Sequence, residues 1–205
     1  MSLLEVKNLK TSFKTLRGMV TAIDGVSFNI DKDEMVAIIG ESGCGKSVTS
    51  QSIMRLYPET DKSVEYEGEV LFNGEDILHI PFKEMAKHRG NDIAMIFQDA
   101  LASLNPVFTV GDQIIEALRI HKKITKKEAR KEAIKLLEQT GIPDAAKRVD
   151  AYPHELSGGM RQRAMIALAL SCRPQILIAD EPTTALDVTI QAQIMEMIVN
   201  LNKEY

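Results

Sequence analysis

The stretch "GESGCGKS" (residues 40–47) decides the fold of this chain. It fits the pattern G-x-x-x-x-G-K-[ST], which forms a phosphate-binding loop when it lies between a buried strand and a helix. The preceding "MVAIIG" (residues 35–40) is a continuous apolar run, which predicts a buried parallel strand. A helix is predicted from about residue 46 to residue 56. The local context therefore agrees with the motif.

The residue types in this loop indicate how it would hold phosphate. Its glycines allow backbone N–H groups to turn inward, and the N-terminus of the following helix adds favourable partial charge. Lys46 would neutralise the β- and γ-phosphates, and the hydroxyl of Ser47 would bind Mg²⁺. A glycine turn that only starts a helix would not explain a lysine at this position. The expected binding residues are Gly40, Glu41, Ser42, Gly43, Cys44, Gly45, Lys46, Ser47 and Val48.

An acidic pair follows a second apolar run, "ILIADE" (residues 176–181). Two adjacent carboxylates at the end of a core strand are costly unless a cation lies nearby. We expect Asp180 to hold Mg²⁺ through water and Glu181 to orient or polarise an attacking water. Taken alone, the stretch could equally be an Asp-Glu turn before Pro182. The phosphate loop favours the metal site.

Composition and charge narrow the class of protein. Of the 205 residues, 44% are hydrophobic and 26% are charged, which is typical of soluble globular domains. The net charge is -4, and a dedicated nucleic-acid binder usually has a strong basic face. The N-terminus lacks a signal-peptide core, and no apolar run reaches the roughly 18 residues that span a bilayer. A membrane role would need a partner. Cys44 and Cys172 lack metal-ligand spacing, which suggests a reducing compartment.

Hydrophobic patterning predicts three regions along the chain. Residues 3–30 indicate an antiparallel β layer, and residues 92–98 and 175–180 indicate further buried strands. Between them, residues 100–156 have helical periodicity. The basic run "HKKITKKEARK" (residues 121–131) is interpreted as one solvated helix face.

Two helices are predicted in more detail. Thr125 and Glu128 form a T-x-x-E capping box, and Gly141 with Pro143 ends that helix. Its buried face is predicted to comprise Ala129, Ala133, Leu136 and Leu137. A final helix is predicted to carry an apolar stripe of Ile190, Ile194, Met197, Ile198 and Leu201.

The stretch "HELSGGMRQR" (residues 154–163) is a second candidate anion site, because two adjacent glycines precede a helix expected to begin near Met160. Taken alone, it would be a flexible helix cap.

Taken together, these motifs resemble the nucleotide-binding domain of ATP-binding cassette (ABC) transporters across essentially all 205 residues. "GESGCGKS" resembles the Walker A loop, and "ILIADE" resembles Walker B with the catalytic glutamate. "IFQD" contains the Q-loop glutamine, Gln98; "LSGGM" resembles the signature; and "TALD" ends in the D-loop aspartate, Asp187. P-loop kinases and small GTPases share only the first two features, and the GTPase motif N-K-x-D is absent from the sequence.

The resemblance implies an α/β fold. It implies a P-loop NTPase (RecA-like) core with a mainly parallel sheet, an N-terminal antiparallel β layer and a helical subdomain insertion. In that scheme residues 1–205 form a single domain, with the core at residues 1–99 and 157–205 and the helical subdomain at about residues 100–156.

The resemblance also implies the ligands and the roles of the site residues. ATP and Mg²⁺ are the expected cofactors, with Lys46, Gln98 and Glu181 catalytic and Ser47, Gln98 and Asp180 at the metal. Two cassettes pair head to tail in this family. Ser157, Gly158 and Gly159 would therefore contact ATP held by the partner, and Asp187 would also lie near the nucleotide. Phe13 matches the family's adenine-stacking aromatic, although a core or edge-strand phenylalanine explains it equally well.

Within the family, "FQDALASLNPVFTVGDQI" and "YPHELSGGMRQR" resemble the branch that imports dipeptides and oligopeptides, which includes nickel importers. Ala100 replaces the usual proline, and Met160 replaces the glutamine most common in the family. The implied partners are permease subunits, a second cassette that is identical or a sister protein, and indirectly an extracytoplasmic solute-binding protein. Nucleic acid is not expected. The implied location is the cytoplasmic face of the inner membrane.

Other functions remain open at this point. DNA-acting cassette ATPases share these motifs but usually insert coiled coils or zinc-binding cysteines, neither of which occurs in the 110 residues from Ser47 to Ser157. Glu181 argues against a non-catalytic regulator. No histidine follows His154, whereas the family has a switch histidine after a further strand. We therefore expect a fragment that binds nucleotide but hydrolyses it poorly.

Overall fold

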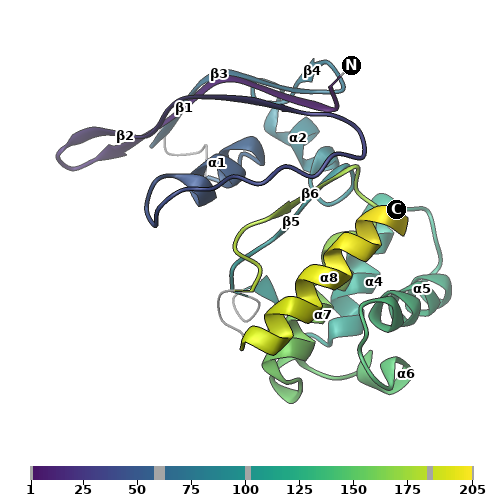
Figure 1. The fold of residues 1–205 in the computed structure, drawn as a ribbon. Helices are drawn as coiled ribbons and strands as arrows, with labels where there is room; N and C mark the ends of the chain where they lie inside the picture. The colour runs from purple at the N-terminus through teal and green to yellow at the C-terminus, as the bar shows by residue number, and fades with distance from the viewer. Residues whose placement is uncertain (1, 58–62, 100–102, 184–186, 205) are drawn as a thin grey trace. The chain divides into compact units, whose positions relative to one another are not determined.

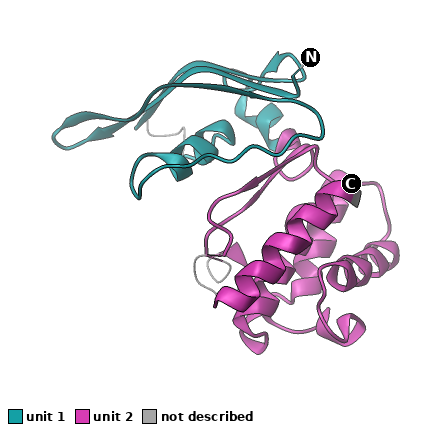
Figure 2. Cartoon of the chain, viewed as in Figure 1, with its two compact units in different colours: residues 1–86 teal, residues 87–205 magenta. Residues whose placement is uncertain are grey.

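The fold was examined in a computed structural model, which describes residues 2–57, 63–99, 103–183 and 187–204 (Figure 1). The chain divides into two compact units, Met1–Ala86 and Lys87–Tyr205 (Figure 2).

Unit 1 contains a four-stranded antiparallel sheet with the order β2-β1-β3-β4. Its strands are β1 (Leu4–Thr15), β2 (Gly18–Ile30), β3 (Val64–Phe72) and β4 (Glu75–Asp76). The antiparallel β layer predicted for residues 3–30 is thus confirmed. What the sequence did not indicate is that β1 lies between β2 and β3, so both of its edges are paired.

A β-bulge in β1 changes which residues of this strand are buried. Leu4 and Val6 are buried on one side of the bulge, and Leu9 and Thr11 are buried on the other, so the alternation moves by one residue. The bulge lies opposite Gly68, whose φ of 92° and close approach to the backbone of β1 leave no room for a side chain.

Helix α1 (Lys46–Ile53) begins where the phosphate loop ends, as the motif predicts. It stops three residues before the predicted end, because Arg55 adopts a left-handed conformation with φ of 48°. Its buried residues are Thr49, Ser52 and Ile53. A second helix, α2 (Phe82–His88), buries Met85.

The strand predicted at residues 35–40 is wrong. These residues form neither strand nor helix, and they are exposed, with Ile39 93% accessible. An apolar run indicates a preference for burial, but a strand forms only where a neighbouring strand accepts its backbone hydrogen bonds. Among the described strands of unit 1, none is paired with this run.

Unit 2 contains two parallel strands, β5 (Ile93–Ile96) and β6 (Ile176–Ala179). They pair from Ile93 with Ile176 to Ile96 with Ala179. All four residues of β5 are buried, as expected for an apolar run without alternation. Both predicted strands of this region are confirmed.

The helical region of unit 2 comprises α4 (Val110–His121), α5 (Lys126–Gln139), α6 (Ala145–Arg148) and a short 3₁₀ helix (Pro153–Glu155), followed by α7 (Gly158–Leu170). The predicted capping box is confirmed: the Thr125 hydroxyl accepts a hydrogen bond from Glu128 N at 3.3 Å, and Glu128 Oε2 accepts one from Thr125 N at 2.8 Å. The predicted face of α5 is buried in one apolar cluster with α4 and α7.

The final helix, α8 (Val188–Glu204), has the predicted apolar stripe. Ile194 and Leu201 are buried, and the other three stripe residues pack partly buried against the same cluster. This cluster also contains Ile96 of β5 and Ile166 of α7, so α8 covers the strand pair.

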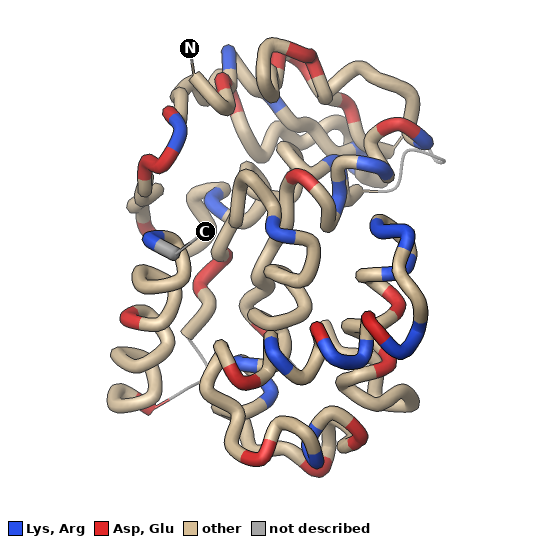
Figure 3. The backbone as a smooth tube through the Cα atoms, turned by 90° about the vertical axis from the view of Figure 1, so that its right-hand side faces the viewer, with Lys and Arg blue, Asp and Glu red and all other residues tan. Residues whose placement is uncertain are grey.

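Charged residues of both signs alternate along much of the chain (Figure 3). The predicted solvated helix face at residues 121–131 is confirmed only in part. Lys126 and Lys127 are exposed, but the run does not form one helix, because α4 ends at His121 and α5 begins at Lys126. Arg130 instead forms a bidentate ion pair with Asp150, with distances of 2.7 and 2.6 Å. In the part of the chain that the structure describes, no helix is both long and apolar enough to span a bilayer.

Candidate nucleotide-binding site

The predicted phosphate loop joins an extended segment to α1. Gly43 and Gly45 have φ values of 79° and 97°, which side chains rarely tolerate. Gly45 occupies the N-cap of α1 and contributes no side-chain cap. No side chain at the N-cap therefore covers the first N–H groups of the helix. An anion site requires such uncovered N–H groups.

Lys46 folds back over this loop. Its Nζ donates hydrogen bonds to the carbonyl oxygens of Gly40 and Glu41, both at 2.9 Å. A side chain at position 40 would contact the Cys44 sulfur, so the loop favours glycine there. The ammonium group is thus held across the loop, close to where the motif predicts phosphate.

In unit 2, Gln98 and Glu181 lie together beyond the ends of β5 and β6. Gln98 Nε2 donates a hydrogen bond to Glu181 Oε2 at 3.3 Å. The contact arises because parallel strands end at the same edge of a sheet, where the ligand sites of α/β proteins occur. Glu181 has a φ of 45°, a left-handed conformation that is unusual for a residue with a side chain.

Asp180 is buried, and its backbone N–H donates to Ile96 O at 3.0 Å. Carboxylate and hydroxyl oxygens are the ligands that Mg²⁺ prefers, so Asp180 and Ser47 have suitable chemistry. Within the described residues, no group of three or more histidine, cysteine or acidic side chains could enclose a metal.

The signature stretch forms the N-terminus of α7. Ser157 is the N-cap, and its Oγ accepts a hydrogen bond from Met160 N at 3.3 Å. The helix begins at Gly158, two residues before the predicted position. Ser157 and Gly158 are exposed, so this helix end is accessible.

Gln162 makes a contact that the sequence did not predict. It is 3% exposed, and its Nε2 donates to Pro182 O, directly after Glu181. The signature helix is thereby tied to the segment that carries the predicted catalytic glutamate. A glutamine inside a helix gives no sequence signal for such a contact, because its partner lies 20 residues away.

Asp187 caps α8 through a hydrogen bond from Ile190 N to its Oδ1 at 3.0 Å. Residues 184–186 of "TALD" and Ala100 lie outside the described residues. Phe13 is half-buried in β1, where its ring meets Tyr57 edge to face with centroids 4.8 Å apart. Its predicted contact with adenine remains a prediction.

The two units divide the predicted site residues between them. Phe13 and residues 40–48 belong to unit 1, whereas Gln98, Asp180, Glu181, Asp187 and residues 157–159 belong to unit 2. Within unit 2, the structure brings Gln98 and Glu181 into contact. The assembly of all these residues into one site remains a prediction.

Comparison with known proteins identifies the family. Residues 23–184 match the ABC transporter family, and the chain belongs to it. A solved structure of the ATP-binding cassette MJ0796, described as a dimeric post-hydrolysis state bound to ADP and Pi, is 31% identical and has a TM-score of 0.85. The match covers 98% of this chain and 83% of that one. The predicted α/β fold class is confirmed.

Two relatives from Bacillus subtilis (strain 168) indicate the branch. The dipeptide transport ATP-binding protein DppD is 57% identical over 98% of this chain and 60% of its own length. The oligopeptide transport ATP-binding protein OppD is also 57% identical, over 98% of this chain and 56% of its own length. The predicted resemblance to the peptide-importer branch is confirmed. The chain spans somewhat more than half the length of these relatives.

Proposed function

We propose that the protein binds and hydrolyses ATP as the cassette subunit of a transporter that imports peptides. The observation that carries this proposal is the contact between Gln98 and Glu181 at the ends of two parallel strands, next to the buried Asp180. A carboxylate held by a neutral amide remains available to accept a proton from water. The sequence identity to DppD and OppD supports the peptide branch.

Lys46 would neutralise the terminal phosphates of ATP. Its ammonium group donates to two carbonyl oxygens, which are weaker partners than phosphate. Phosphate would replace them while the glycine N–H groups and the N-terminus of α1 supply further donors.

Ser47, Asp180 and Gln98 would hold Mg²⁺. When bound, this ion would offset the negative charge that develops on the phosphate during hydrolysis. Glu181 would accept a hydrogen bond from the attacking water and orient it towards the terminal phosphate. Gln98 would keep the Glu181 carboxylate in position.

The exposed N-terminus of α7 would complete the site of a partner cassette. Ser157 and Gly158 would donate to the terminal phosphate of ATP on that partner. Inverting a two-state equilibrium from 1:99 to 99:1 takes about 5.5 kcal/mol. Hydrogen bonds to charged groups contribute about 1.5–3 kcal/mol each, so a few contacts at two sites suffice to close a dimer.

The remaining partners are proposed from the relatives. Permease subunits would carry the solute through the membrane, a solute-binding protein outside would deliver it, and an identical or sister cassette would form the dimer. The protein would act at the cytoplasmic face of the inner membrane. Peptides are the proposed cargo because DppD and OppD are dipeptide and oligopeptide transport proteins.

The test uses the intact transporter complex. Glu181→Gln should lower the ATP hydrolysis rate by about 100-fold or more, within the range ascribed to general base catalysis, while ATP binding is retained. The ATP-bound dimer should then accumulate in size-exclusion chromatography. Glu138→Gln, an exposed position on α5, serves as the control. A Glu181→Gln complex that hydrolyses ATP at the normal rate would contradict the proposed role.

Ser157→Arg tests the partner site separately. This variant should leave ATP binding by the monomer near normal and abolish ATP-driven dimerisation. Asn200→Arg, at an exposed position on α8, controls for adding one positive charge to unit 2. Loss of ATP binding by the Ser157→Arg monomer would mean that Ser157 acts on its own nucleotide, and the dimer proposal would fail.

A further inference from the structure

A buried hydrogen bond connects strand β1 with helix α1 in unit 1. Thr11 Oγ1 donates to Ser52 Oγ at 2.9 Å, and both residues are fully buried. Of the hydrogen bonds that the structure describes between two side chains of unit 1, this is the only one whose two residues are both fully buried. Such a bond has a preferred direction and length, so it restricts sliding of α1 along β1 more than an apolar contact would.

The same two segments meet again at an aromatic pair. Phe13 lies two residues after Thr11, on the same face of β1, because the pairing with β3 runs without a register shift from Thr11 to Phe13. Its ring packs at 82° against Tyr57, which follows α1 by four residues. One polar contact and one aromatic contact therefore fix α1 and the following turn against β1.

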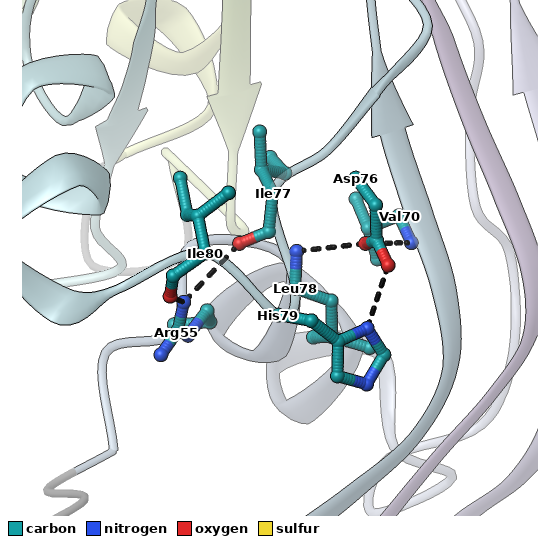
Figure 4. A network of polar contacts seen from close by, with 7 residues as sticks. All are labelled: Arg55, Val70, Asp76, Ile77, Leu78, His79 and Ile80. Carbon is teal, nitrogen blue, oxygen red and sulfur yellow. Dashed lines mark hydrogen bonds and ion pairs between the residues drawn. The ribbon is translucent and has the colours of Figure 1, made fainter.

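The C-terminal end of α1 is held by a third contact (Figure 4). Arg55 Nη1 donates to Ile77 O at 3.3 Å and to Ile80 O at 2.6 Å. The segment that receives these bonds is itself held by Asp76, which accepts from the N–H groups of Val70 and Leu78. Helix α1 therefore has little freedom to rotate or shift.

The position of α1 matters because its first residues, Lys46 and Ser47, belong to the phosphate loop. Phe13, the candidate adenine contact, lies on the strand to which α1 is fixed. The helix has eight residues and spans about 12 Å, so a small rotation at Ser52 would move its N-terminus relative to the Phe13 ring. The Thr11–Ser52 bond thus connects the helix that begins at the phosphate loop with the strand that carries Phe13.

We propose that Thr11 and Ser52 are positioning residues that fix the phosphate loop relative to Phe13, and that Tyr57 orients the Phe13 ring for a nucleobase. Base and triphosphate then bind as two ends of one ligand at a preset separation. This inference rests on the proposed ATP site. Its consequence is selective: losing the Thr11–Ser52 bond should weaken ligands that span both ends and spare a ligand that fills the phosphate loop alone.

The test compares ATP with inorganic triphosphate, both with Mg²⁺, by calorimetric titration of the full chain. Ser52→Ala should raise the dissociation constant for ATP about tenfold, because preorganisation is lost, and leave that for triphosphate within about twofold. Thr11→Ser retains the hydroxyl that donates to Ser52 and should bind ATP as tightly as the unsubstituted chain. Ser50→Ala is the matched control, because the Ser50 hydroxyl donates within α1 to Lys46 O.

A second variant keeps the test decisive if Ser52→Ala is poorly folded. Thr11→Val combined with Ser52→Ala removes both hydroxyls, so neither is left buried without a partner. The double variant should again bind ATP more weakly while it binds triphosphate as the unsubstituted chain does. Equal weakening of both ligands, or of neither, overturns the inference.

The unsubstituted chain separates this inference from the proposed function. If it binds triphosphate and ATP equally tightly, the base adds nothing, and the positioning role is overturned while the phosphate site stands. If it binds neither ligand, the proposed function itself fails.

Discussion

The carboxylate of Asp76 shows how a single side chain stabilises the fold of unit 1. Burial raises its pKa, but hydrogen bonds from His79, Leu78 N and Val70 N outweigh this effect, so the pKa lies below its ordinary value. A carboxyl group with a lowered pKa stabilises the folded state above its unfolded pKa. That stability is lost as the pH falls from the unfolded value through the folded one.

The first prediction concerns this residue. Asp76→Asn should lower the free energy of unfolding at neutral pH, and the difference from the unsubstituted chain should shrink as the pH falls below 3.8, the ordinary value for aspartate. Urea unfolding of both proteins at a series of pH values measures this difference in the free energy of unfolding. Asp33→Asn removes an exposed carboxylate of the same unit as the control. A difference that stays constant down to pH 2 would rule out the proposed linkage.

Gln162 and Tyr57 illustrate the limit of sequence reasoning at this scale. Lys46, Gln98 and Glu181 were predicted to be catalytic residues because their motifs have fixed spacing. Gln162 and Tyr57 contact Pro182 and Phe13 across distances in sequence that no motif records. Such contacts depend on how the chain folds back, so only the structure reveals them.

At the scale of elements, helix α4 depends on a close backbone approach. A side chain at Gly111 would overlap Val149, whose carbonyl oxygen accepts a hydrogen bond from Gly111 N at 2.8 Å. Alanine favours a helix over glycine by about 1 kcal/mol. Overpacking of a tight core costs about 1–3 kcal/mol, and the main-chain oxygen of Val149 cannot rotate away, so the packing cost should prevail.

The second prediction follows from this balance. Gly111→Ala should destabilise the protein by up to about 2 kcal/mol in chemical unfolding, although alanine is the better helix former. Glu116→Ala, exposed on the same helix, should change stability by less than about 0.5 kcal/mol. A Gly111→Ala protein that is more stable than the unsubstituted chain would show that α4 can move away from Val149.

Periodicity predicted the elements well where each helix has its own signals. Thr125, Glu128 and Gly141 specify both ends of α5 through local contacts, and the stripe of α8 covers an apolar cluster. The strand expected at residues 35–40 shows the opposite case. Its apolar residues specify burial, but a strand needs a partner that the local sequence cannot supply.

For the whole molecule, nucleotide binding should be visible as stability. A ligand that binds only the folded state adds about 2.7 kcal/mol at 100 times its dissociation constant. The third prediction is that saturating ATP with Mg²⁺ raises the thermal unfolding temperature of the full chain and that Lys46→Ala abolishes the rise. Lys126→Ala, an exposed lysine on α5, should retain it. An equal rise in the Lys46→Ala protein would mean that ATP binds elsewhere.

The sequence by itself determined the family and the order of the motifs, and it predicts which residues carry the chemistry, because glycine loops and acidic pairs act through fixed local spacing. It also determined most helices, whose hydrogen bonds and caps lie within a few residues of one another. Only the tertiary structure decided which face of β1 is buried, how α1 is held against that strand, and that Gln98 meets Glu181. These features depend on a bulge, on register and on contacts between distant segments, and none of them is encoded within a single stretch of sequence.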